Sequence, residues 1–124
     1  MPISAGDVND LKSKFVDART ALVAMLGEAD KAKQAECAAK VKQVTKTTVD
    51  LFPVLIAKAK GTPAEGKLNE LKTAWDVFRD TRDNQVIPYF FAGKVDEAKA
   101  IGGGIQKERF GKISAMVDAL AASV

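Results

Sequence analysis

Apolar residues recur at alternating steps of three and four along four stretches of the chain. In residues 7–26 this seam is Val8, Leu11, Phe15, Ala18, Leu22 and Met25. Such spacing is typical of a helix that buries one face against neighbouring helices. Similar seams run through residues 31–60, 63–92 and 94–122. The pattern therefore predicts four helices with few residues between them.

Glycine and proline residues mark the expected ends and bends of these helices. Gly61 suits the left-handed position after a helix, Thr62 the N-cap and Pro63 the first helical residue. Glu65 stands where it would complete a capping box with Thr62. Pro88 lies inside the third stretch, where it is expected to bend the last turn without ending the helix.

Short turns between long helices make sequence neighbours antiparallel. We therefore expect an all-α fold, an antiparallel up-down-up-down four-helix bundle that forms a single domain over residues 1–124. Both termini then lie at the same end of the bundle.

Composition excludes several classes of protein. The chain has 124 residues, 19 Lys and Arg against 16 Asp and Glu, one Cys and no His. Without histidine there is no Ser-His-Asp triad, His-ligated haem or di-iron site, so we expect no cofactor and no metal. Basic and acidic residues are interleaved, which argues against nucleic-acid binding. No acid–base dyad or phosphate loop is recognisable, so we expect a protein that is not an enzyme.

Arginines interrupt the seams of the third and fourth stretches. Arg82 and Arg109 occupy positions where apolar residues are expected. Counting residues from the turns at a fixed rise places Arg19, Arg82 and residues 102–104, three successive glycines, in one layer. An arginine in a partly dry layer can bind a carboxylate through two parallel hydrogen bonds. The glycines would leave room for such a ligand.

The candidate ligand-binding residues are these arginines and the polar side chains expected near them: Arg19, Arg82, Gln85, Tyr89, Gln106 and Arg109. Other interpretations stay open. The arginines can instead be solvated or paired with Asp17, Asp76, Asp80 or Asp83, because charges on bundle helices usually are. The glycines can mark a local helix break or a close helix–helix contact.

Three stretches carry a family resemblance. Residues Trp75–Pro88, Ala92–Ala100 and Gly103–Phe110 resemble bacterial methyl-accepting chemotaxis receptors whose sensor is a four-helix bundle. The turn from Ala92 into the last helix is the most typical piece. The resemblance covers nearly the whole chain and indicates a sensor class, but it does not indicate a particular ligand.

The resemblance implies the periplasmic domain of a bacterial inner-membrane receptor, with one transmembrane helix before the first bundle helix and another after the last. It also implies a homodimer that binds a small polar or anionic ligand between the first helix, the last helix and the partner's first helix, largely through arginines. Arg19 is the only arginine of the first helix. Other members bind within one bundle, where Arg82, Gln85, Tyr89 and Arg109 would be better placed. Ligand binding would then displace the last helix relative to the first.

Two further functions remain as alternatives: the sensor domain of a membrane histidine kinase, and a structural or interaction bundle without a small ligand. A carrier bundle of the cytochrome kind is disfavoured by the missing histidines.

Overall fold

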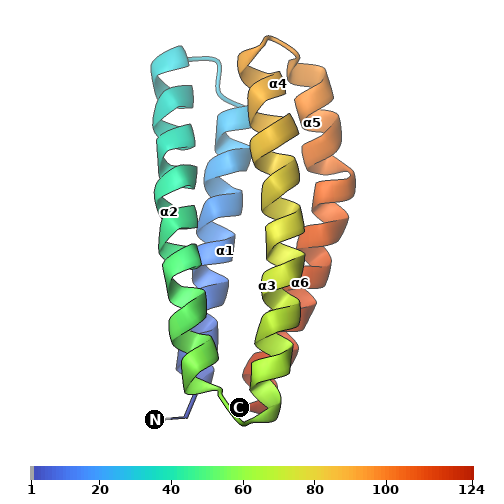
Figure 1. The fold of residues 1–124 in the computed structure, drawn as a ribbon. Coiled ribbons are helices and arrows are strands. Elements are labelled where there is room, and N and C mark those ends of the chain that lie inside the picture. Colours follow the sequence, from blue (N-terminus) through green and yellow to red (C-terminus); the bar gives the residue numbers. More distant parts are fainter. Residues whose placement is uncertain (1) are drawn as a thin grey trace.

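The computed structural model describes residues 2–124; Met1, included in the expected domain, lies outside the described residues. Four antiparallel helical columns form an up-down-up-down bundle, which confirms the predicted fold class (Figure 1). The first two columns are α1 (Ala5–Leu26) and α2 (Lys31–Lys58). The third consists of α3 (Pro63–Thr81), the π-helical turn η1 (Arg82–Val86) and α4 (Ile87–Phe91), and the fourth of α5 (Val95–Gly103) and α6 (Ile105–Ser123). Both termini lie at one end.

Capping explains where some of the helices begin and end, and one predicted cap is absent. Helix α1 begins at Ala5 rather than Asp7 because Ser4 and Asp7 form a reciprocal capping box. Gly61 adopts the expected left-handed conformation, with φ of 79°. Thr62 is the N-cap of α3, but its hydroxyl donates to the carbonyl of Ala59 at 2.6 Å. The predicted capping box between Thr62 and Glu65 is therefore wrong, because the hydroxyl serves the preceding turn.

The third column contains a wider turn than the sequence predicts. The amide of Ile87 donates to the carbonyl of Arg82, five residues back, which defines η1. Pro88 follows directly; it has no amide hydrogen, and its ring would clash with the carbonyl of Asn84 in a regular α-helix. The irregularity of the third column is thus a π-bulge over residues 82–86, directly upstream of the proline.

The fourth column is broken at Gly104, whose φ and ψ are −101° and −107°. A Cβ added to Gly104 would lie 2.7 Å from the carbonyl oxygen of Ala100, whereas one added to Gly103 would meet nothing within 4 Å. Gly102 is buried, and a Cβ there would lie 3.2 Å from Leu26 Cδ1. Of the three glycines, Gly104 is thus the one that the backbone break requires.

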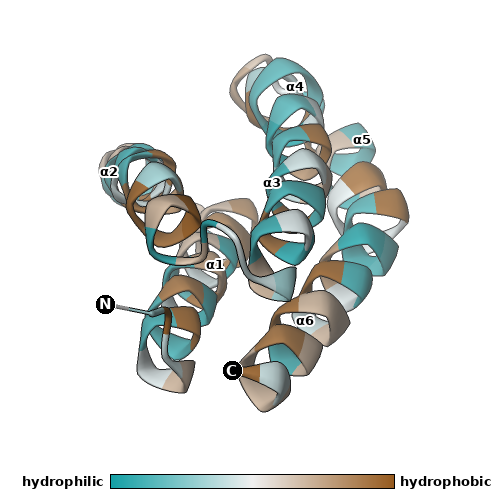
Figure 2. Cartoon of the chain, turned by 60° about the horizontal axis from the view of Figure 1, so that its bottom comes forward, coloured by the Kyte–Doolittle hydropathy of each residue, from teal (hydrophilic) through white to brown (hydrophobic). Residues whose placement is uncertain are grey.

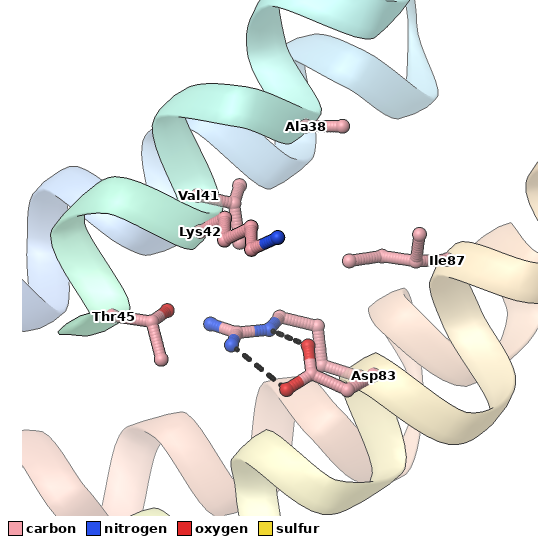
Figure 3. Close-up of a pocket in the computed structure, with 7 residues that line it drawn as sticks. Ala38, Val41, Lys42, Thr45, Asp83 and Ile87 are labelled. Atoms are coloured by element: carbon pink, nitrogen blue, oxygen red, sulfur yellow. Dashed lines mark hydrogen bonds and ion pairs between the residues drawn. The ribbon is translucent and has the colours of Figure 1, made fainter. Parts of the chain in front are cut away.

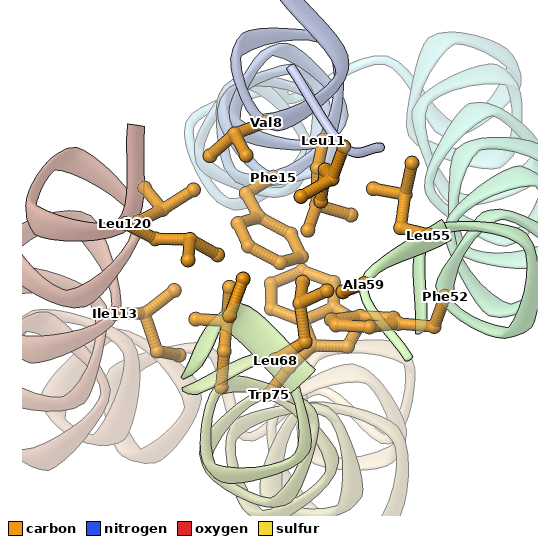
Figure 4. Packing of buried hydrophobic residues seen from close by; sticks show 14 of the residues in the cluster. Val8, Leu11, Phe15, Phe52, Leu55, Ala59, Leu68, Trp75, Ile113 and Leu120 are labelled. Carbon is orange, nitrogen blue, oxygen red and sulfur yellow. The ribbon is translucent and has the colours of Figure 1, made fainter. Parts of the chain in front are cut away.

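The core consists of two apolar clusters. The one nearer the termini centres on the stacked rings of Phe15 and Trp75, with centroids 4.4 Å apart (Figure 4). Phe78 stacks on Trp75 in turn. The smaller cluster lies toward the other end and comprises Ala21, Leu22, Met25, Val41, Val86, Phe90 and Ala98. Figure 2 shows the four columns surrounding this shared interior.

We predict that the two exposed glycines at the break respond differently to alanine. Gly104→Ala should lower the free energy of unfolding by about 1–3 kcal/mol, because its Cβ meets a backbone oxygen. Gly103→Ala, the matched control, should be neutral or stabilising by up to about 1 kcal/mol, because alanine favours helix. Urea denaturation followed by circular dichroism measures both. Equal midpoints for the two variants would contradict this account of the break.

Candidate functional site

A layer of polar residues separates the two apolar clusters. On α2, Thr45 and Thr48 lie between Val41 of one cluster and Phe52 of the other. The other columns repeat the arrangement with Arg19 on α1, Arg82 on η1, and Gln106 and Arg109 on α6; we call these six residues the polar layer. The sequence prediction that Arg19, Arg82 and the glycines share a layer agrees with this arrangement. Their side chains, however, turn toward different columns.

Gln106 and Arg109 hold α6 against α3. The side-chain amide of Gln106 donates to the carbonyl of Phe78 at 2.7 Å. Arg109 Nη1 donates to Gln106 Oε1 at 3.0 Å and to Thr81 Oγ1 at 2.7 Å. The Gln106 amide and Arg109 Nη1 are therefore engaged inside the bundle, and neither residue lines one of the clefts described below.

Gln85 and Tyr89 line neither of the two clefts that contain Arg19 and Arg82. Gln85 is exposed, and Tyr89 is half-buried with the ammonium of Lys94 5.6 Å from its ring centroid. The six candidate residues therefore do not form one pocket. The structure places Arg19 in one cleft, Arg82 in another, and the other four outside both.

Arg19 holds the broken end of α5. Its Nη2 donates to the carbonyl of Gly102 at 3.1 Å, and its guanidinium lies 5.5 Å from the ring centroid of Phe110. A cation at a helix C-terminus interacts favourably with the helix dipole and satisfies a carbonyl that the helix leaves unpaired. Burial lowers the pKa of the Arg19 guanidinium from its ordinary value. Its Nη1 is buried and has no hydrogen-bond partner among the described residues.

Arg19 opens onto a groove of about 470 Å³ between α1, α5 and α6. We call it the Arg19 groove; its lining residues are Arg19, Val23, Leu26, Gly27, Lys99, Gly102, Gly103 and Lys107. Three of them are cationic and none carries a carboxylate. The groove therefore concentrates positive charge beside a guanidinium nitrogen that lacks a partner.

Arg82 faces the opposite side, toward α2. Its Nε and Nη2 donate to the carboxylate of Asp83 at 2.9 and 3.3 Å, so the pairing that the sequence left open does occur (Figure 3). The side chain of Arg82 is only 2% exposed. It lines a cleft of about 370 Å³, the Arg82 cleft, whose lining residues are Ala38, Val41, Lys42, Thr45, Arg82, Asp83 and Ile87.

Sequence reasoning missed Lys42, Thr45, Lys99 and Lys107. Lys99 and Lys107 flank the glycine run at residues 102–104, and two cations beside a predicted helix break are a signal that could have found the groove. Thr45 also has a signal, because it lies on a seam with Val41 and Thr48 at steps of four and three, whereas the exposed Thr47 lies off that seam.

The structure is thus a four-helix bundle with a buried polar layer and with charged clefts in the half far from its termini. Residues 3–123 match the family described as the four-helix bundle sensory module for signal transduction, and the chain belongs to this family of methyl-accepting chemotaxis protein modules. This confirms the resemblance seen in the sequence. The family is one of sensory signalling and not a catalytic one. Comparison with curated proteins and with solved structures finds no match.

Two further observations concern the described residues alone. Within residues 2–124, none of the helices is both long and apolar enough to cross a membrane. The same residues contain no group of three or more His, Cys, Asp or Glu side chains arranged to hold a metal ion.

We predict that Gln106 is structural. Gln106→Met should lower the free energy of unfolding by about 1–3 kcal/mol, because Arg109 loses an acceptor in a half-buried position. The matched control Gln85→Met, at an exposed helical position, should stay within about 0.5 kcal/mol of the parent. Urea denaturation measures both. If the two variants were equally stable, the contact between α3 and α6 would not depend on this amide.

Proposed function

We propose that this module is the extracytoplasmic domain of a transmembrane chemotaxis receptor, and that it binds a small anionic ligand in the Arg19 groove. One observation carries the proposal: the groove is lined by Arg19, whose buried Nη1 has no partner among the described residues, and by two further cations, with no carboxylate. An anion would give this nitrogen a partner and offset the mutual repulsion of the cations.

The groove favours a ligand with more than one negative charge. Arg19, Lys99 and Lys107 together exceed the charge of a single carboxylate. A volume of about 470 Å³ lies in the range of small-molecule sites. Val23 and Leu26 provide an apolar wall against which a short carbon chain can pack. A dicarboxylate of a few carbon atoms satisfies these conditions, and the domain would bind it without transforming it.

A homodimer fits the same surface. Val16 and Val23 are one heptad apart on α1 and are 41% and 52% exposed. A seam of this spacing suits packing against a second helix. Because Val23 also lines the Arg19 groove, the α1 helix of a partner would cover the groove from outside.

Signal transmission follows from which columns the ligand joins. The Arg19 groove is formed by α1, α5 and α6, and α1 and α6 carry the two termini at the same end (Figure 1). A ligand that prefers one relative position of these columns shifts the population toward it. In a receptor whose termini continue into membrane helices, a shift of one or two ångströms of α6 along α1 would cross the membrane.

We expect succinate, used as the dicarboxylate probe, to bind the domain in isothermal titration calorimetry. Arg19→Gln and Lys99→Gln should each weaken binding by about tenfold or more, because each removes a charged hydrogen-bond donor from the groove. Lys99 is exposed, so its variant should fold as the parent does. The control Lys46→Gln, on an exposed face of α2, should keep full affinity.

If succinate binding were saturable but unchanged in both Arg19→Gln and Lys99→Gln, the ligand would not bind in the Arg19 groove. If succinate, malonate and inorganic phosphate all failed to bind at 10 mM, about the weakest affinity calorimetry can follow, the proposal of a polyanion site would be overturned.

A further inference from the structure

The Arg82 cleft lies between α2 and the third column and shares no lining residue with the Arg19 groove. It is therefore a separate feature of the bundle. Three polar side chains that line it have a donor group without a partner within residues 2–124.

The first is the guanidinium of Arg82. Asp83 accepts hydrogen bonds from Nε and Nη2, but Asp83 is 46% exposed and lies on the outer edge of the pair. The remaining nitrogen, Nη1, is buried and has no partner among the described residues. A buried donor of a charged group that lacks an acceptor is costly, so this nitrogen calls for a partner from outside the described residues or for a structural reason.

The second is the hydroxyl of Thr45, on the wall opposite Arg82 (Figure 3). Two other threonines of α2, Thr47 and Thr48, donate to the carbonyls four residues before them, at 3.2 and 2.9 Å. The Thr45 hydroxyl is buried without any partner among the described residues. Two unpaired donors thus face the same space from different columns.

The third is the ammonium of Lys42, which points into the cleft and forms no ion pair within residues 2–124 (Figure 3). The lining residues therefore carry two cations and one carboxylate, an excess of one positive charge. The rest of the wall is apolar: Ala38, Val41 and Ile87.

We propose that the Arg82 cleft is a second anion-binding site, and that it takes a monocarboxylate with a compact apolar body. One carboxylate oxygen accepts from Arg82 Nη1 and the other from the Thr45 hydroxyl, with Lys42 balancing the charge. The apolar body packs against Val41 and Ile87. This site does not rest on the proposed function of the Arg19 groove, whose three cations without an acid favour a dianion.

The test uses benzoate as the probe and the 124-residue chain labelled with ¹⁵N. Titration should give saturable chemical-shift changes centred on residues 38–45 of α2 and on η1. Benzamide has the same shape without the charge and should bind at least tenfold more weakly, because charge-assisted hydrogen bonds are about twice as strong as neutral ones. Equal affinities for benzoate and benzamide would overturn the anion site.

Thr45→Val separates a binding role from a structural one. The substitution keeps the shape and removes the hydroxyl, so benzoate affinity should fall about tenfold, the loss of one buried hydrogen bond. The melting temperature should stay the same or rise, because an unpaired buried hydroxyl becomes a methyl group. The matched control Thr47→Val, at an exposed position of α2, should bind as the parent does.

Arg82→Met provides a second variant that should fold, because methionine fills the space and the exposed Asp83 is not left as a buried charge. It should abolish benzoate binding and leave succinate binding at the Arg19 groove unchanged. The proposal is overturned if benzoate shows no saturable binding up to 10 mM, if its shift changes centre on Arg19 and Gly102, or if Thr45→Val binds as Thr47→Val does. If the cleft took only a water molecule, benzoate would show no saturable binding, which is the first of these outcomes.

Discussion

Two columns of this bundle cannot run as straight α-helices through the half that lies far from the termini, and this constraint shapes the clefts. Pro88 has no amide hydrogen, and the wider turn η1 directly precedes it. Gly104 adopts a backbone conformation in which a Cβ would meet the carbonyl of Ala100. The first irregularity accompanies the burial of Arg82 against α2, and the second leaves the Gly102 carbonyl free to accept from Arg19. Each arginine thus contacts or lies in an irregular part of the backbone: Arg82 is part of η1, and Arg19 donates to the carbonyl of Gly102 beside the break at Gly104.

The other half of the molecule, nearer the termini, contains the larger apolar cluster. The larger apolar cluster stacks Phe15, Trp75 and Phe78 with rings 4.4 and 5.4 Å apart, an arrangement that adds to simple area burial. The smaller cluster is built mainly of aliphatic residues and Ala, with Met25 and Phe90. Regions with less buried apolar area open more easily, and ligand-binding elements are drawn from such regions. The division of the core therefore separates a part that maintains the fold from a part that can adjust.

Sequence periodicity predicted the four columns well because helix–helix burial alone determines the apolar spacing. It also identified Arg82 as an exception on a seam, and the glycine run as a point of interest. It could not show that Arg82 and Arg19 turn to opposite sides, because that depends on the π-bulge, and a proline predicts an irregularity without its register. Nor could it show that Gln106 and Arg109 are engaged with Phe78 and Thr81, since these contacts join residues 28 positions apart.

In the proposed mechanism the larger cluster has a second role. The Arg19 groove lies on the far side of this cluster from the termini, so any displacement produced there has to pass through it. A close-packed interior has low compressibility and transmits strain. Ile113, Val117 and Leu120 of α6 are buried in that cluster together with Val8 and Leu11 of α1. A shift of α6 at the groove would therefore reach the C-terminus as a translation along α1, and the compliant point is confined to Gly104, next to the ligand.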